Sequence, residues 1–383
     1  MRSGFPKILA VVILALGLPL AWFVLRQPEI ERVSSARLAP DLAEHEIYRT
    51  YDLGGGDKVI HFAAQPLFLP PALMTEVMAR DAELHRGLAA LGYTIRFHSY
   101  LKGADINYFL FQGELDGAVG GNMPAISAAA KNDVVIAALV DQYFATIVAG
   151  GIDLVEDLRG KRIAYGFGSQ AHYSLLRSLT AAGLTEDDVH LVRMDVTRMP
   201  EALRRGDIDA FCAWEPTPTM ALTADPDLVP LSRDINAGYM YFRSEFSDRH
   251  PEAVRLILAS LVRALTWMTS RDDNLLRAAR WARDAGQELS GAESNLSPEQ
   301  YARLGKESLR SIASLPMFAS SDTTAAGRIF EAFNFLQGIG SVPDSVAWSR
   351  VRDSFLPGPL EEVLRKPVRY RLDEYTPLPR EMP

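Results

Sequence analysis

Polar residues stand at the starts of two predicted helices, each directly after a glycine-containing turn. Ser169 and Gln170 follow a Gly-Phe-Gly turn at the end of a predicted strand, and Asn122 follows a Gly-Gly pair in the same way. The free N–H groups and the positive dipole end of a helix N-terminus bind anions. The sequence therefore predicts a small-anion site between the two helix starts. The alternative is that Ser169 only caps its helix and that Asn122 only fills a turn.

Further side chains are placed where they could complete such a site. They lie at predicted strand ends or in the first turn of a helix: Asp141, Tyr143, His172, Trp214 and Glu215. A carboxylate such as Glu215 would repel a purely anionic ligand and attract an ammonium group, so Glu215 and Asp141 favour a zwitterion, or a sulfonate with a polar tail, over nitrate. The alternatives are a core position for Trp214, helix capping by His172, and a solvated turn acid at Glu215.

Composition limits the classes of function. The 383 residues carry a formal net charge of −8 and show no basic stripe, which argues against nucleic-acid binding. A single cysteine, Cys212, excludes internal disulfides and multi-thiolate metal sites. His172 has no second histidine or acid nearby in the sequence, so we expect neither a metal nor a cofactor.

The N-terminus departs from this ordinary globular composition. Arg2 and Lys7 precede an uncharged run over residues 8–25. The run has about the minimum length of a membrane span, and the preceding positive charges predict that the rest of the chain lies outside the cytoplasm. We expect residues 1–27 to form an uncleaved signal-anchor helix and residues 28–52 a tether, with a cleaved signal peptide as the alternative.

Strands and helices alternate through the first half of the chain, which is typical of an α/β fold with a mostly parallel sheet covered on both faces. The last third is predicted to be helical and must pack on a sheet formed earlier. The chain is therefore expected to form two lobes and to cross between them twice, near residues 145–150 and 230–238, which makes a hinge and a ligand cleft. The predicted segments are lobe 1 over residues 53–145, lobe 2 over 146–235, a return to lobe 1 with C-terminal helices over 236–365, and a surface tail over 366–383. Single elements include a helix over 71–91 and strands over 134–140 and 239–242.

Five motifs follow one another in a characteristic order. They are residues 113–118 (GELDGA), 121–131 (GNMPAISAAAK), 157–164 (DLRGKRIA) with Gly168, Ser169 and His172, 202–210 with Trp214-Glu215-Pro216, and 250–252 (HPE). Together they resemble solute-binding proteins of ABC importers, in the branch for nitrate, taurine, alkanesulfonates and related small anions. The resemblance covers residues 59–364.

This resemblance implies a two-lobed type II periplasmic-binding-protein-like fold with two hinge crossovers and no enzymatic activity. It implies a monomer on the periplasmic, extracytoplasmic side of the membrane that delivers a small anionic or zwitterionic ligand to the membrane subunits of an ABC permease. Gln65, at the end of the first predicted strand, takes a ligand-binding role from the resemblance alone. The N-terminus differs from the family pattern, because members are usually released from the membrane or lipidated.

Three other functions stay open. Gly166, Gly168 and Ala171 mimic a dinucleotide fingerprint, but Asp195 falls too far along the chain for the usual ribose contact. Enzymes of thiamine-precursor synthesis share the fold, yet a single cysteine cannot build their iron site. A membrane-tethered ligand sensor or accessory domain without transport is the third alternative.

Overall fold

The computed structural model describes residues 42–378 apart from 55, 57, 132 and 311–316. The chain divides into residues 1–50 and residues 51–383. In the first unit, two short 3-10 turns are described, η1 (Leu42–Glu44) and η2 (Tyr48–Thr50). The predicted signal-anchor helix and most of the tether lie outside the described residues. Everything below concerns the second unit.

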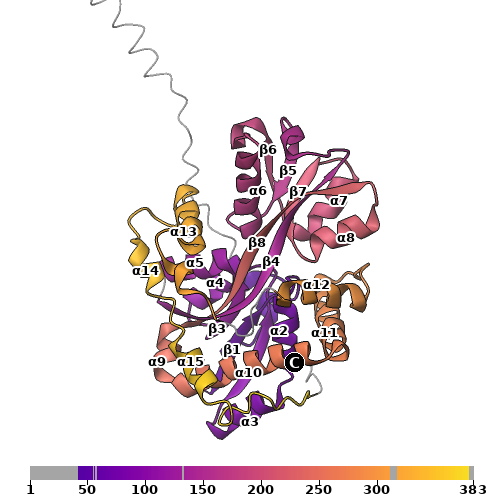
Figure 1. Ribbon diagram of the computed structural model, residues 1–383. Helices are drawn as coiled ribbons and strands as arrows, with labels where there is room; N and C mark the ends of the chain where they lie inside the picture. Colours follow the sequence, from indigo (N-terminus) through magenta and orange to yellow (C-terminus); the bar gives the residue numbers. More distant parts are fainter. Residues whose placement is uncertain (1–41, 55, 57, 132, 311–316, 379–383) are drawn as a thin grey trace, which may run out of the picture. The chain divides into compact units, whose positions relative to one another are not determined.

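The second unit is built on one eight-stranded sheet in the order β2-β1-β3-β8-β4-β7-β5-β6 (Figure 1). The strands are β1 (Val59–Ala64), β2 (Thr94–Ser99), β3 (Gly117–Gly121), β4 (Val134–Gly150), β5 (Arg162–Tyr165), β6 (His190–Arg193), β7 (Ala210–Trp214) and β8 (Leu228–Arg243). The pairs β1–β2, β1–β3, β5–β6 and β5–β7 are parallel, whereas every pairing of β4 and β8 is antiparallel. The sheet is therefore mixed, and the mostly parallel arrangement expected from the sequence holds only within each outer group of strands.

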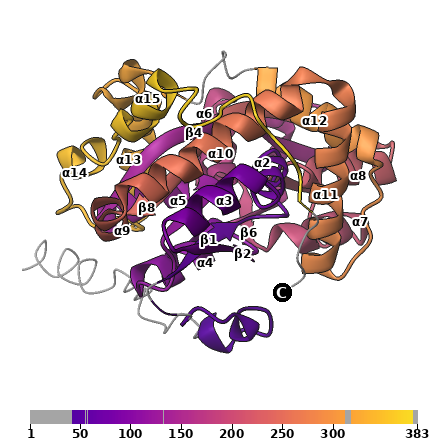
Figure 2. The ribbon, with the colours of Figure 1, turned by 90° about the horizontal axis from the view of Figure 1, so that it is seen from below.

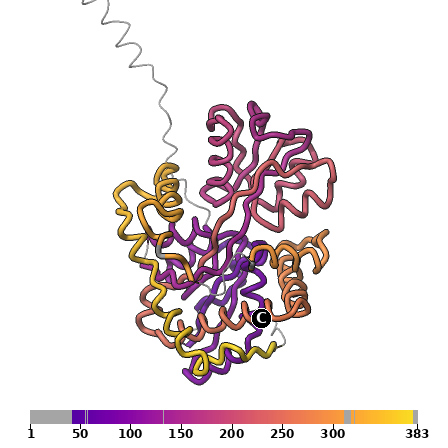
Figure 3. The backbone as a smooth tube through the Cα atoms, in the orientation of Figure 1, coloured from indigo at the N-terminus to yellow at the C-terminus, as the bar shows by residue number. Residues whose placement is uncertain are grey.

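Two long strands connect the halves of the sheet. β4 and β8 pair along nearly their whole length, and each is much longer than the short strand predicted from its most apolar residues. At one end β8 pairs with β3, and at the other end β4 pairs with β7. The chain thus passes through β4 from the first half to the second and returns through β8 (Figure 3). These strands form the two crossovers that the predicted fold class requires.

Helices cover both halves of the sheet. The first half carries α2 (Pro71–Met78), α3 (Ala82–Ala90), α4 (Gly103–Phe111) and α5 (Asn122–Lys131), and the second carries η3 (Val155–Leu158), α6 (Gln170–Ala181), η4 (Glu186–Asp188), η5 (Val196–Arg198), α7 (Met199–Arg204) and α8 (Thr217–Ala224). The C-terminal part forms α9 (Ser244–Arg249), α10 (Pro251–Ser270), α11 (Asp272–Ser290), α12 (Pro298–Arg310), η6 (Ser320–Thr323), α13 (Arg328–Gly338), α14 (Trp348–Arg352) and α15 (Gly358–Arg365). The single helix expected over 71–91 is two helices, because Asp81 leaves the helical conformation and caps α3 by accepting a hydrogen bond from the Glu83 amide at 3.0 Å.

α10 is the central helix of the largest apolar core. Its residues Val254, Ile257, Leu258 and Leu261 are fully buried at helical spacing. The helix packs beside α2 and α3, as the view from below shows (Figure 2). Among the described residues α10 is also the one helix long and apolar enough to cross a membrane. Its burial marks it as the core helix of a folded domain.

The described part of the C-terminal tail, residues 366–378, packs on the first half. Tyr370 is buried, the Tyr375 hydroxyl donates to the carbonyl of Val77 at 2.9 Å, and the Ala82 amide donates to the carbonyl of Thr376 at 3.1 Å. Most described residues of the tail are exposed, as expected for a surface segment, and Tyr370 and the hydrogen bonds attach the tail to the first half.

Candidate functional site

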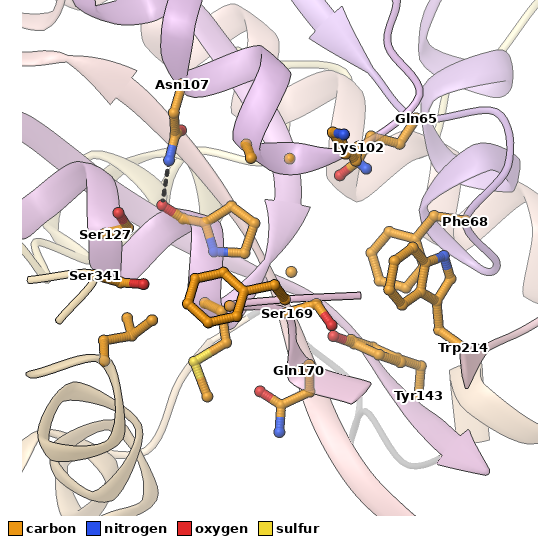
Figure 4. A pocket seen from close by; sticks show the side chains of 18 of the residues that line it. Gln65, Phe68, Lys102, Asn107, Ser127, Tyr143, Ser169, Gln170, Trp214 and Ser341 are labelled. Atoms are coloured by element: carbon orange, nitrogen blue, oxygen red, sulfur yellow. Dashed lines mark hydrogen bonds between the residues drawn. The ribbon is translucent and has the colours of Figure 1, made fainter. Parts of the chain in front are cut away.

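A pocket of about 250 Å³ lies where the two halves of the sheet meet (Figure 4). Its walls come from the loop after β1, the starts of α4, α5 and α6, the middle of β4, the end of β7, and the segment that begins with α13. The lining residues are Gln65, Phe68, Lys102, Gly103, Ala104, Asn107, Gly121, Met123, Pro124, Ser127, Lys131, Tyr143, Phe167, Gly168, Ser169, Gln170, Trp214, Leu336 and Ser341. Such a location between two lobes is typical of ligand sites.

Two helix starts from the first half meet at this pocket. α4 begins at Gly103, and its N-cap residue Lys102 makes no side-chain capping bond. A Cβ atom on Gly103 would lie 2.2 Å from Cγ of Pro124 in α5, so only glycine allows the two helices to approach this closely. Asn107 fixes the arrangement, because its Nδ2 donates to the carbonyl of Pro124 at 2.9 Å (Figure 4).

The second half contributes the start of α6. The Ser169 hydroxyl donates to the carbonyl of Gly166 at 2.6 Å and accepts from the amide of His172 at 3.3 Å, so it serves as the helix N-cap. Gln170 is held by its side chain, whose Nε2 donates to Oδ1 of Asn236. Gln170 lines the pocket, and its backbone amide has no acceptor among the described residues. An anion in the pocket would therefore meet unpaired amide groups from both halves.

Aromatic side chains form one wall of the pocket. The ring of Phe68 packs edge-on against Tyr143 with centroids 4.5 Å apart and lies 6.2 Å from the Trp214 ring. These three residues lie on one side of the pocket (Figure 4). Burial raises the pKa of the Tyr143 hydroxyl well above its usual value, so the group is neutral and acts as a hydrogen-bonding group. The pocket thus suits a ligand that has an anionic head and an apolar body.

The structure brings together five of the nine residues proposed from the sequence. Gln65, Tyr143, Ser169, Gln170 and Trp214 line the pocket. Gln65 is buried after β1, and its Oε1 has no hydrogen-bond partner among the described residues. Whether these residues bind a ligand stays a prediction.

The other four sequence-proposed residues do not line the pocket. Asn122 accepts a hydrogen bond from the amide of Met123 at 2.8 Å and is the first residue of α5. Glu215 is buried, and its Oε2 accepts from the amide of Thr219 at 3.3 Å. Asp141 is fully buried, and its carboxyl group lies against the backbone of Gly238 in β8.

Both buried carboxyl groups have a raised pKa. Burial is the main cause for Asp141 and for Glu215, and the neighbouring backbone of Gly238 or the groups of Thr219 only partly offset it. Because neither residue lines the pocket, the described lining contains no carboxylate that could pair with a ligand ammonium group. Glu215 and Asp141 suggested a zwitterionic ligand in the sequence, but the geometry of the pocket does not support this suggestion.

His172 is also buried, behind the start of α6. Its ring lies 4.4 Å from Tyr165 and 5.1 Å from Phe335 of α13, and its Nε2 has no hydrogen-bond partner among the described residues. Burial, followed by the charge of Arg193, lowers the pKa of His172 to about 4. The residue thus packs between the second half and the C-terminal segment as a neutral ring.

Stability is expected to fall in acid partly because of His172. Its pKa is about 4 in the folded protein and 6.5 in an exposed chain, so the unfolded state binds more protons as the pH falls from 6.5 to 4. Between pH 7 and pH 4 the free energy of unfolding should drop by about 2–3 kcal/mol more in the natural protein than in His172→Phe. Urea unfolding at each pH measures this difference. The exposed His190 supplies the control substitution, His190→Phe, which should behave like the natural protein; equal losses in all three proteins would contradict the prediction.

Several lining residues were not found from the sequence. Lys102 is the N-cap residue of α4, Asn107 lies on α4 and Ser127 on α5. Leu336 and Ser341 come from more than 200 residues further along the chain. The repeat of Pro124, Ser127 and Lys131 at i, i+3 and i+7 could have placed three residues on one face of α5. Nothing in the local sequence indicates that the α13 segment returns to the pocket. Among the described residues no group of three metal-ligating side chains occurs.

The strands β4 and β8 join two halves of one sheet, and the pocket lies between these halves. This is the architecture of a type II periplasmic binding protein. The sequence model of the NMT1-like family matches residues 89–283, slightly more than half of the chain. The protein belongs to the NMT1-like family.

Individual relatives agree with this assignment. The chain is 30% identical over 183 residues to the taurine-binding periplasmic protein of Escherichia coli K12, a match that covers 45% of this chain and 57% of the relative. The chain thus spans little more than half the length of this curated relative. The crystal structure of the periplasmic aliphatic sulphonate binding protein SsuA from Escherichia coli superimposes with a TM-score of 0.59 at 18% identity, over 79% of this chain and 92% of that protein.

The same fold also occurs in an enzyme. The desulfurization enzyme DSZB superimposes with a TM-score of 0.55 at 16% identity, over 81% of this chain and 99% of that protein. At this identity the likeness concerns the fold alone. Binding and catalysis must therefore be distinguished by the residues of the pocket.

Proposed function

We propose that the protein is the extracytoplasmic solute-binding component of an ABC importer and that it captures a small organic anion of the sulfonate type. The observation that carries this proposal is the convergence of helix starts from both halves on one pocket: Gly103 and Ala104 of α4, and Gln170 of α6. The homology to a taurine-binding periplasmic protein supports the same class of ligand. Oriented amide groups bind an anion without placing a buried countercharge beside it.

Capture would combine binding with movement of the two halves. A ligand that touches α4 and α5 on one side and α6 on the other stabilises the arrangement in which both halves contact it. Bending of β4 and β8 would let the halves close and exclude water, as in hinge-closing binding proteins. The closed form would then dock on the membrane subunits of a permease. Membrane attachment through residues 1–27 and a monomeric state complete the proposal.

The pocket offers no support for catalysis by a thiol. The chain contains one cysteine, Cys212, which lies in β7, is fully buried and does not line the pocket. Burial also raises the pKa of its thiol, which keeps the group protonated. The resemblance to DSZB therefore concerns the scaffold, and a binding role is the function that the pocket residues favour.

Calorimetric titration of the full-length chain in a non-ionic detergent tests the proposed function. We expect saturable binding of ethanesulfonate and of benzenesulfonate, and weaker binding of taurine because no carboxylate lines the pocket to pair with its ammonium group. NAD should give no heat of binding. Absence of saturable binding for every sulfonate would contradict the proposal, and tight binding without uptake by cells that carry the matching permease would favour the tethered sensor.

A further inference from the structure

The charged side chains of the pocket have one sign. Lys102 and Lys131 are both lining residues, and no aspartate or glutamate is among the described residues of the lining. Both lysines belong to the first half, Lys102 at the N-cap of α4 and Lys131 at the last residue of α5. The pocket therefore carries two positive charges in addition to its helix starts.

The lysines lie at different distances from the helix starts that would hold an anionic head group. Pro124, Ser127 and Lys131 line the pocket from one face of α5, seven residues apart from first to last. With a rise of 1.5 Å per residue, the pocket extends roughly 10 Å along the helix axis. A single sulfonate at the start of α4, where Gly103 adjoins Pro124, would leave the Lys131 end of the pocket unused.

Lys131 also has no acidic partner among the described residues. The carboxylate closest to it in sequence, Asp133, forms an ion pair with Arg350 at 3.0 Å. Lys102, by contrast, has its Nζ 3.8 Å from Oδ1 of the buried Asp105, so its charge is partly compensated. The positive charge that is available to a ligand is therefore greatest at the Lys131 end.

From this arrangement we propose that the pocket selects an organic dianion, in which a sulfonate occupies the helix starts and a second anionic group lies near Lys131. The inference rests on the proposed function, because it assumes that an organic anion is bound in this pocket. Pro124 and Ser127, which line the pocket between the start of α5 and Lys131, would contact the body that joins the two anionic groups. An ammonium group at the same position would meet like charge, which explains why the pocket favours a dianion over a zwitterion.

A matched pair of ligands tests the proposal on the full-length chain. Benzenesulfonate and 4-sulfobenzoate differ only in a carboxylate on the ring position opposite the sulfonate. We expect 4-sulfobenzoate to bind about fivefold more tightly at low salt, the upper range for a partly exposed ion pair, and the advantage to shrink at high salt. In Lys131→Gln the ratio of the two dissociation constants should approach one, and in Lys131→Arg it should be retained.

The outcomes separate this proposal from the proposed function. Lys161 lies in the second half and outside the pocket lining, so Lys161→Gln should keep the fivefold preference of the natural protein. Equal affinities for the two ligands in the natural protein, or a preference that survives in Lys131→Gln, would overturn the dianion proposal while the binding of sulfonates stands. Failure of both ligands to bind would overturn both proposals.

Discussion

Replacing Gln170 by proline is expected to weaken the binding of a sulfonate by about 10- to 100-fold relative to Gln170→Ala. Both variants remove the side chain that Gln170 uses to contact Asn236, but only proline also removes the backbone N–H at the start of α6. A hydrogen bond to a charged group contributes about 1.5–3 kcal/mol, which corresponds to this loss of affinity. Calorimetric titration with ethanesulfonate measures the difference between the two variants.

The local backbone allows this substitution. Proline is well tolerated at the first position of a helix, and the preceding residue must be extended. Ser169 has φ −89° and ψ 170°, which satisfies that requirement. Circular dichroism and the unfolding midpoint of Gln170→Pro should therefore match those of Gln170→Ala. If the two variants bind ethanesulfonate equally well, the start of α6 does not contact the anion.

Replacing Arg263 by methionine is expected to lower the free energy of unfolding by about 3–5 kcal/mol. Arg263 is 1% exposed and Asp81 is fully buried; the Arg263 Nε donates to Oδ2 of Asp81 at 2.8 Å. Its Nη1 also donates to the carbonyl of Tyr370 at 2.6 Å, which attaches the C-terminal tail to α10. Removing the guanidinium leaves a buried carboxylate and a buried carbonyl without their partner. Urea unfolding followed by circular dichroism measures the loss.

A double variant separates the buried charge from the lost packing. Asn in place of Asp81 can still cap α3, because its Oδ1 can accept from the Glu83 amide as Asp81 does. The double variant Asp81→Asn with Arg263→Met should therefore be more stable than Arg263→Met alone. Arg204→Met, which breaks the exposed pair with Glu201, should hardly change the unfolding midpoint. A single variant Arg263→Met as stable as Arg204→Met would show that the buried pair does not hold the tail.

Local sequence patterns predicted the fold class and the helix starts of the site. The glycines before Ser169 and before Asn122 end a strand and free the backbone for a helix start, and both helices are present in the structure. The same patterns gave strands that were too short at β4 and β8, because the polar residues in the second parts of these strands resemble loop residues. Their extended conformation comes from pairing with each other, a contact between distant parts of the chain.

The side-chain directions at strand ends could not be predicted in the same way. Glu215 follows β7 as expected, but its carboxyl group turns to the amide of Thr219 at the start of α8 and does not line the pocket. Asp141 precedes Tyr143 by two residues on β4, yet it is buried under Gly238 while Tyr143 lines the pocket. In each case a nearby backbone group competes with the pocket for the side chain.

The sequence by itself determined the alternation of strands and helices, the positions of the helix starts at α5 and α6, and the membership of the family, because these depend on patterns within short segments. The tertiary structure decided the charge of the pocket. Lys102, Lys131 and Ser341 are brought together by the packing of α4, α5 and the α13 segment, while Glu215 and Asp141 are kept outside the lining. Such convergence depends on contacts between residues far apart in the chain, which the order of the residues does not display.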